Sequence, residues 1–324
     1  MSSRDFTPAP YPFYATSGAD RELSAPLART RERYWVNGLF FAMTLVSTTF
    51  VGAAMQYDFN RNLAFDVENH VNALARIWTH PSQIWLGLPF SMTLLTILLA
   101  HEFGHYLACQ YYHVDASLPY FLPAPTLTGT FGAFIRVRSA FTSRRALFDI
   151  GIAGPLAGFV FLAPALAVGL AFSKVMPGIG LRGDLHFGAP AIQWMLERAV
   201  FPGVRSTDIY LHPVARAAWI GALATALNLL PIGQLDGGHI LYALAGRRHR
   251  LISLLSIAAL VLMGVYWRVW LWLFWGVVLF WLGRRHPAID DPASLGLGRV
   301  KLGLIALVVF LLCFTLAPIS TSGL

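Results

Sequence analysis

Seven stretches of the chain are apolar over about the length that a helix needs to cross a lipid bilayer. They cover residues 36–57, 84–110, 146–173, 214–244, 251–267, 269–283 and 300–318. A spanning helix needs about 20 mostly apolar residues, because the hydrocarbon core offers its backbone no water to hydrogen-bond. The fifth and sixth runs are short, and we expect a tight hairpin around Trp267 and Arg268. The pattern predicts an all-α polytopic membrane protein with about six or seven transmembrane helices.

The composition agrees with this class. Of the 324 residues, 56% are hydrophobic and only 12% are charged, whereas soluble proteins carry roughly 25% charged residues. The net charge of +8 is explained by arginine in cytoplasmic loops, so we expect the lipid bilayer and no nucleic acid as a partner. With a cytoplasmic N-terminus, two-thirds of the 24 Lys and Arg residues lie on the inner side, which predicts that orientation.

The chain divides into a tail and a membrane domain. Residues 1–34 are polar and contain prolines, without the short apolar core of a signal peptide, so they predict a flexible cytoplasmic N-terminal tail. Residues 35–324 form the membrane-embedded domain, with a core at about 84–244. The outer loop at 174–213 is shorter than an independent domain usually is.

The connection at residues 114–145 breaks helical structure yet remains apolar. It contains Pro119, Pro123 and Pro125, and it predicts a short re-entrant segment that packs against protein. Within it, apolar side chains alternate over Gly129–Val137 with the period of a strand. Such a strand is able to hold an unwound substrate by edge pairing, and a plain interfacial hairpin is the alternative.

His101-Glu102-Phe103-Gly104-His105 is an HExxH motif inside a predicted membrane helix. Residues i and i+4 share a helix face, so the two imidazoles can hold one metal ion, with Glu102 as general base toward a bound water. Zinc suits such ligands and lowers the pKa of a bound water to about 7. A chance match is the alternative, but titratable residues in a membrane helix indicate function.

A catalytic zinc normally has three protein ligands, and the third is sought among the later acids. Asp236 lies deep in the run Asn228–His239, where Pro231 and several glycines break the helix and present the carboxylate across a cavity. Capping of the second half-helix by Asp236 is the alternative and is compatible with ligation. Asp149 lies beside Arg144 and Arg145, so an interfacial charge pair is expected there instead.

These motifs resemble the site-2 protease family of intramembrane zinc metalloproteases. The resemblance joins HEFGH to NLLPIGQLDGG on a later helix, and FDIGIAGPLAGF (148–159) is similar to the helix between them. It covers about residues 84–244. Many members carry a PDZ domain or a pair of CBS domains. The loop at 174–213 is too short for a PDZ domain, and residues 284–299 are too short for a CBS pair. We therefore expect a compact form of the family.

The resemblance implies a three-helix catalytic core with one zinc ion per chain. It implies His101, His105 and Asp236 as the metal ligands and Glu102 as the catalytic base. It also implies that Asn228 stabilises the oxyanion, a helix-packing hydrogen bond being the alternative for this amide.

Two neighbouring features are interpreted structurally. The stretch Gly154–Gly158 is taken as close helix packing, because small residues let helices approach each other. His239 follows the glycines after Asp236 and is left outside the ligand set.

The resemblance implies hydrolysis of peptide bonds within or near transmembrane segments of membrane-anchored, single-span protein substrates. The expected location is a bacterial cell membrane, with the metal site toward the cytoplasmic side. A non-catalytic metal-binding membrane protein or transporter is the alternative, because broken helices and buried titratable groups also mark transporters. Glu102 argues for catalysis, since a pure metal binder needs no base between two ligands.

Overall fold

The computed structural model describes residues 33–141, 143–282, 291 and 294–321. Most of these residues are helical and the strands are short, which confirms the all-α polytopic class. The predicted tail at residues 1–34 lies outside the described residues except for its last two.

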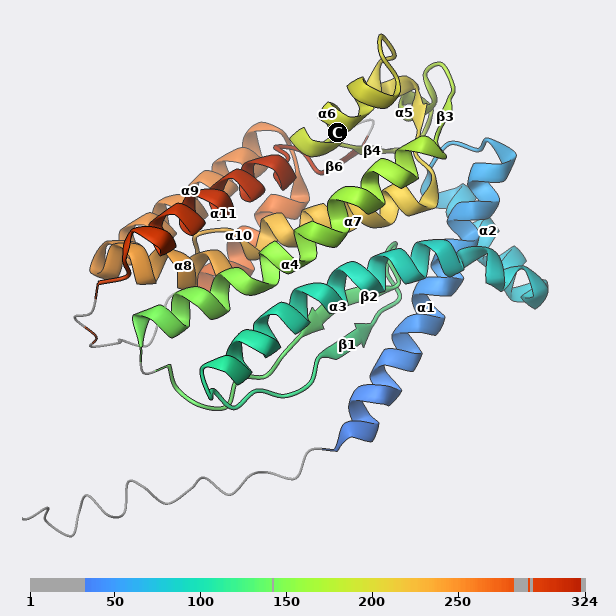
Figure 1. Cartoon of the computed structure of the whole chain (residues 1–324). Coiled ribbons are helices and arrows are strands. Elements are labelled where there is room, and N and C mark those ends of the chain that lie inside the picture. Colours follow the sequence, from blue (N-terminus) through green and yellow to red (C-terminus); the bar gives the residue numbers. More distant parts are fainter. Residues whose placement is uncertain (1–32, 142, 283–290, 292–293, 322–324) are drawn as a thin grey trace, which may run out of the picture. The chain divides into compact units, whose positions relative to one another are not determined.

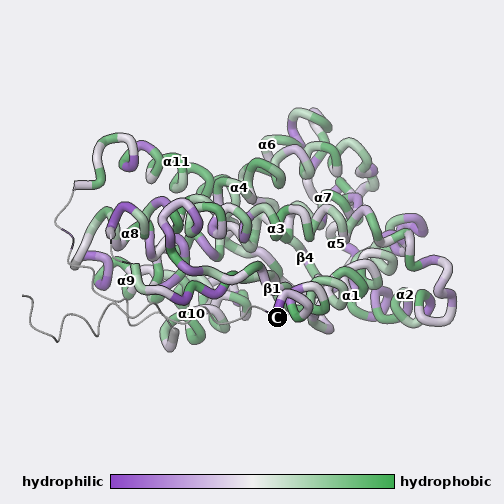
Figure 2. Tube along the Cα trace, turned by 60° about the horizontal axis from the view of Figure 1, so that its bottom comes forward, coloured by the Kyte–Doolittle hydropathy of each residue, from purple (hydrophilic) through white to green (hydrophobic). Residues whose placement is uncertain are grey.

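Four helices in the described part of the chain are long and apolar enough to cross a membrane. They are α1 (Tyr34–Arg61), α3 (Leu88–Tyr111, which continues the 3-10 helix η2 at Pro81–Gly87), α4 (Arg144–Ala171) and α9 (His249–Tyr266). Apolar residues run along these helices, while hydrophilic stretches gather toward helix ends and connecting segments (Figure 2). The chain is therefore a membrane protein by the length and composition of its helices.

The other predicted spans correspond to shorter helices. They are α7 (Pro213–Asn228), α8 (Asp236–Ala245), α10 (Trp270–Leu282) and α11 (Leu297–Cys313). The run at 214–244 is divided between α7 and α8, as the helix-breaking residues in it predict. A 3-10 turn, η4 (Gly246–Arg248), joins α8 to α9. The expected hairpin between α9 and α10 turns at Arg268, whose φ is 52°.

Helices α3, α4 and α7–α8 pack together as the predicted three-helix core (Figure 1). Ile97 of α3 and Leu162 of α4 are buried and belong to the same apolar cluster. Both lie against Gly221 of α7, where an added Cβ would come within 2.9 Å of Ile97. A small residue at this crossing therefore lets the three helices approach closely.

The re-entrant segment is a β-hairpin that packs against α1. Strand β1 (Tyr120–Pro123) pairs antiparallel with β2 (Thr130–Phe134), so the predicted strand period is confirmed. The Asn37 amide of α1 donates a hydrogen bond to the Leu118 carbonyl (3.0 Å), and the Ser47 hydroxyl donates one to the Gly129 carbonyl (2.7 Å). The hairpin backbone thus finds its partners in protein, as membrane depth requires.

The predicted outer loop is folded into small elements, and we call residues 174–211 the distal module. Its elements are β3 (Lys174–Val175), α5 (Ile179–Arg182), β4 (Leu185–Phe187), α6 (Ala191–Val200), η3 (Ser206–Asp208) and β5 (Ile209–Tyr210). Strand β3 pairs with β5, and β4 pairs with β6 (Ile319–Thr321) from the other end of the chain. The module lies at the N-terminal end of α7, near α2 (Val67–Thr79) (Figure 1).

Candidate metal centre and active site

Helix α3 carries the first two predicted ligands one turn apart. His101 and His105 are buried, and their Nε2 atoms lie 3.2 Å from each other. The Nδ1 atom of His105 lies 2.7 Å from the Ile150 carbonyl of α4. A carbonyl only accepts hydrogen bonds, so Nδ1 carries a proton and Nε2 is the atom that would bind a metal ion.

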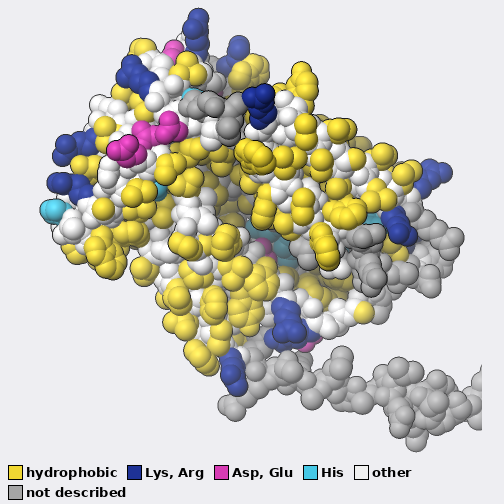
Figure 3. All heavy atoms as spheres, turned by 180° about the vertical axis from the view of Figure 1, so that it is seen from behind, with side chains coloured by type: hydrophobic (Ala, Val, Ile, Leu, Met, Phe, Trp, Pro, Cys, Tyr) yellow, Lys and Arg dark blue, Asp and Glu magenta, His cyan; other side chains and the backbone are white. Residues whose placement is uncertain are grey.

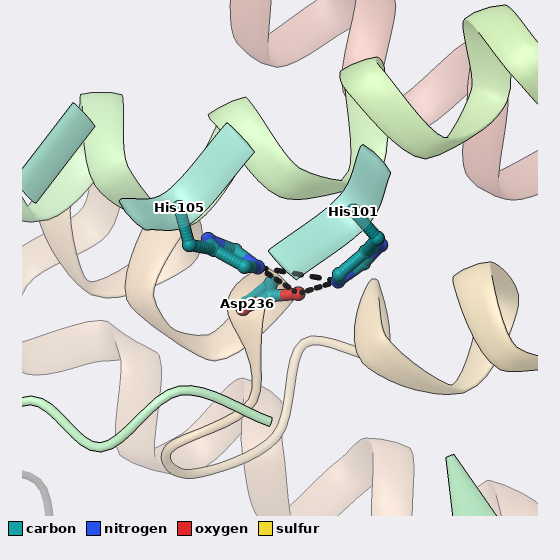
Figure 4. A group of neighbouring side chains, drawn as sticks. All are labelled: His101, His105 and Asp236. Atoms are coloured by element: carbon teal, nitrogen blue, oxygen red, sulfur yellow. Dashed lines mark hydrogen bonds and ion pairs between the residues drawn. The ribbon is translucent and has the colours of Figure 1, made fainter. Parts of the chain in front are cut away.

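The broken helix carries the third predicted ligand. Helix α7 ends at Asn228, and the chain folds back so tightly that a Cβ on Gly237 would come 2.1 Å from the Leu229 carbonyl. Helix α8 then begins at Asp236, whose Oδ2 lies 3.2 Å from His101 Nε2 and 3.3 Å from His105 Nε2 (Figure 4). The N-cap position belongs to Leu235. The capping alternative for Asp236 is therefore wrong, and its carboxylate faces the two imidazoles.

The three donor atoms have the spacing that zinc requires. Their pairwise distances are 3.2 to 3.3 Å, and zinc bonds of 2.0 to 2.1 Å in a tetrahedron separate neighbouring ligand atoms by about 3.3 to 3.4 Å. Two imidazole nitrogens and one carboxylate form a typical catalytic zinc set that leaves a fourth position free. No other group of three possible ligands comes together in the described part of the chain.

Glu102 and Asn228 complete the predicted constellation beside the ligands. Glu102 is 6% exposed, and its carboxylate lies near the backbone N–H of Ile135, just after β2. The Asn228 amide nitrogen lies 3.1 Å from His101 Nε2. The structure therefore brings all five predicted site residues together, from three helices.

These residues line one cavity of about 250 Å³ that extends to the hairpin. Its wall also includes Ala133 of β2, Val137 and Phe141 from the segment after β2, and His239 of α8. His239 stays outside the ligand cluster, as predicted, and its ring lies 5.8 Å from that of Phe141. A hollow with histidine and acidic side chains at its bottom is visible from behind in an otherwise largely hydrophobic face (Figure 3).

Gly154 has a more specific role than the helix packing predicted for it. A Cβ at this position of α4 would come 2.1 Å from His105 Nε2, so only glycine leaves room for the imidazole. Gly158 lies against His101 less tightly, at 3.3 Å. Spacing along α4 reveals a small-residue face, but it does not reveal which ring that face accommodates.

Asp149 pairs with a different arginine from those predicted. Both its carboxylate oxygens bind Arg299 of α11, at 2.9 and 2.7 Å, and the Tyr112 hydroxyl donates to the same carboxylate. Arg144 and Arg145 instead bond to Asp291 and to backbone carbonyls. The pair joins α4 to α11, a contact that neighbours along the chain do not predict.

Comparisons with known proteins agree with this site. Residues 89–269 match the model of peptidase family M50. The chain is 30% identical over 312 residues to the probable chloroplastic zinc metalloprotease EGY1 of Oryza sativa subsp. japonica, covering 92% of this chain and 53% of that protein. It is also 30% identical over 327 residues to EGY1 of Arabidopsis thaliana, covering 92% and 56%. The chain thus spans about half the length of these curated relatives.

A third relative, the probable chloroplastic zinc metalloprotease EGY2 of Arabidopsis thaliana, is 31% identical over 246 residues, covering 73% of this chain and 43% of that protein. The matched family region contains both halves of the metal site, His101 and His105 on one side and Asp236 on the other. The chain belongs to peptidase family M50, the site-2 protease family of membrane zinc metalloproteases, and zinc is the metal that its donor set fits.

Proposed function

We propose that this protein is an intramembrane zinc endopeptidase that hydrolyses peptide bonds within or near transmembrane segments of membrane-anchored, single-span proteins. Such cleavage is regulated intramembrane proteolysis. The observation that carries the proposal is the position of Glu102, a buried carboxylate beside three zinc-ligand atoms and in the wall of the same cavity. A protein that only binds or transports a metal needs no base at that place, so the site favours hydrolysis.

The proposed chemistry assigns one task to each group. When bound, zinc supplies a Lewis acid that activates water and polarises the scissile carbonyl. A Glu102 carboxylate oxygen accepts the proton of the attacking water and later delivers it to the nitrogen of the leaving amine. The Asn228 amide donates a hydrogen bond to the developing oxyanion. His105 keeps its orientation through its Nδ1–H bond to the Ile150 carbonyl.

The open edge of the hairpin is the part that would hold the substrate. The Arg136 N–H bonds to Ser117 Oγ, and the Arg136 carbonyl accepts from the Ser117 N–H. Backbone groups of neighbouring strand residues point to opposite edges, so the Ile135 N–H points to the other edge, on the side of Glu102. This edge faces the metal site, and an unwound substrate that pairs with it would lie beside the reacting groups.

The membrane placement in this proposal is a bacterial cell membrane with a cytoplasmic N-terminus. His105 lies six residues before the end of α3, about 9 Å along the helix axis, so cleavage would release a product at the side of the loop at 112–143. The distribution of Lys and Arg supports the cytoplasm as that side. Reporter fusions within this loop test the orientation, and an external reporter signal contradicts it.

The decisive experiment compares the wild type with Glu102→Gln. The variant keeps the ligands and is expected to retain zinc while losing cleavage, by about 10²-fold or more. Proteomics of membrane fractions is expected to show single-span fragments that accumulate only with the variant, and these fragments identify the substrates. Normal cleavage by Glu102→Gln would refute the mechanism.

Proline substitutions test edge pairing. Ile135→Pro is expected to impair cleavage and to spare zinc, but it also removes the N–H that lies near Glu102. Ala133→Pro is the matched variant, because the backbone alternation points its N–H to the same open edge without a bond to Glu102. Unchanged cleavage by Ala133→Pro supports the alternative of a plain interfacial hairpin.

A further inference from the structure

A second cavity lies at the other end of α7 from the metal site. It has a volume of about 190 Å³ and is lined by residues of the distal module, by Phe65 and by Arg216 of α7. Arg216 precedes Asn228 by twelve residues, which places the cavity about 18 Å from the metal site along the helix. A small ligand bound there is too far from the metal to be the reacting group.

Arg216 is the charged group of this cavity. Its guanidinium lies over the rings of Phe65 (4.9 Å) and Phe187 (4.5 Å). No described residue forms a hydrogen bond or ion pair with this guanidinium, although such a group carries five N–H donors. The rings hold the cation in place and leave its edge available, which is the arrangement that suits a planar carboxylate.

Gln193 of α6 supplies an acceptor in the same wall. This side chain is 5% exposed, and its amide nitrogen donates to Glu197 at 2.6 Å. Its carbonyl oxygen Oε1 is buried and has no hydrogen-bond partner. A buried acceptor without a donor is costly, so a ligand with an N–H group would satisfy it.

Three other polar side chains around the cavity already have partners. Tyr210 donates to the Leu63 carbonyl, Ser206 donates to Glu197, and His186 bonds to the Gly180 carbonyl. None of the described residues in the lining is acidic. The nearest acidic side chain outside the lining that acts on Arg216 is Asp58, which lies 3.6 Å from His70 and acts on Arg216 only through space.

The rest of the wall is apolar. Ile179, Ile209 and Leu211 line the cavity and are buried. A matching ligand therefore combines one carboxylate, one N–H group and a small apolar body, and the C-terminal residue of a peptide with an apolar side chain has all three. We propose that the cavity beside Arg216 is a binding site for the free C-terminus of a peptide, with Arg216 on the carboxylate and Gln193 Oε1 on the amide N–H.

The test measures binding to the full-length protein in detergent, independently of proteolysis. The probe is a short N-blocked peptide that ends in leucine with a free carboxylate, and it is compared with the same peptide as a C-terminal amide. Loss of a charge-assisted hydrogen bond predicts that the amide binds at least about tenfold more weakly. Octanoate, which lacks the N–H, is expected to bind more weakly than the free-acid peptide.

Variants then locate the site. Arg216→Met keeps an apolar stem between the two rings and is expected to weaken peptide binding by at least about tenfold. Arg198→Met is the matched control, because Arg198 also lies over a ring, that of Trp194 at 4.2 Å, but does not line the cavity. Ala189→Leu fills the cavity with Arg216 intact and is expected to weaken binding as well. Zinc content and thermal stability check that each variant is folded.

The outcomes separate the proposal from its competitors. Equal binding of acid and amide, or full binding by folded Arg216→Met and Ala189→Leu, overturns it. Octanoate that binds as tightly as the peptide overturns the role of Gln193 and assigns the cavity to fatty acids. Inorganic phosphate that competes at the same concentration as the peptide reduces the site to a general anion site and also overturns the proposal.

Discussion

The two ends of α7 illustrate opposite ways of placing charge in a membrane protein. At Asn228, two histidines and a carboxylate converge with distances of 3.2 to 3.3 Å, and one cation satisfies all three. At Arg216, a single cation is held by two rings and has no partner of opposite charge in contact among the described residues. The first end is arranged for a metal ion, and the second is arranged for an anion.

The two ends of α7 also differ in how far the sequence marks them. The metal end is signalled by HExxH within one helix and by a helix break in another. The Arg216 end has no motif, because its rings, Phe65 and Phe187, and its acceptor, Gln193, come from three separate segments. Predictions for the two ends therefore differ in kind, and variants at one end should leave the other intact.

The largest effect is expected from Asp236→Ala. Loss of a residue that hydrogen-bonds to a metal ligand lowers metal affinity by about 10- to 100-fold. Removal of one of the three predicted ligands themselves should lower zinc affinity by more than that. Zinc content measured by elemental analysis after gel filtration checks this, and cleavage should be lost with the metal. Arg216→Met at the other end of α7 is expected to retain zinc; a variant of Asp236 that keeps full zinc excludes it as a ligand.

Gly154→Ala is the next test, because it acts on the metal end without removing a ligand. The added methyl overlaps His105, so zinc affinity should fall by about tenfold or more. Gly158→Ala is the control on the same helix, since its Cβ approaches His101 to only 3.3 Å and should cost much less. Equal zinc retention by the two variants would mean that the ring of His105 has space to move.

Arg299→Lys tests the ion pair with Asp149, which serves as a reference because its two charges are in direct contact, unlike the groups at either end of α7. Lysine keeps the charge but loses the two-point contact with Asp149, and we expect a loss of about 1 to 2 kcal/mol in unfolding free energy. Thermal unfolding in detergent measures it, with Lys301→Arg, an exposed position on the same helix, as the control. A change in zinc stoichiometry would show that this pair supports the metal end after all.

Titration of His212, near the Arg216 end of α7, is expected to have the smallest effect, a change of protein stability with pH. Its Nδ1 caps α7 by accepting from the Val214 N–H at 3.2 Å, and burial, aided by Lys174, holds the pKa of the imidazole below its usual 6.5. Because the fold favours the neutral ring, the stabilisation by this cap is complete above pH 6.5 and is lost as pH falls through the lowered pKa.

The expected loss is about 1 kcal/mol, measured as thermal stability against pH. His212→Asn is the control, since asparagine caps a helix without titrating in this range. The variant should therefore show a flatter profile below pH 6.5. An unchanged profile would assign the acid sensitivity to another group.

The hairpin and α4 show which features can be predicted from the sequence and which cannot. Alternation over Gly129–Val137 predicts a strand, and the structure contains β2 at Thr130–Phe134. The same alternation does not say which edge faces Glu102, because that depends on the pairing of Arg136 with Ser117. Likewise, the charge of Asp149 is visible in the sequence, while its partner Arg299 lies 150 residues away.

Local sequence patterns predict the membrane class, the helix of the candidate metal ligands, the candidate base Glu102 and the helix break before Asp236. Each of these depends on local properties: apolar run length, four-residue spacing on a helix, and residues that end a helix. The packing of separate elements adds that Gly154 makes room for His105, that the Ile135 N–H lies near Glu102 and that Arg216 lines a cavity. Those features are contacts between elements, and they exist only once the helices and the distal module are packed.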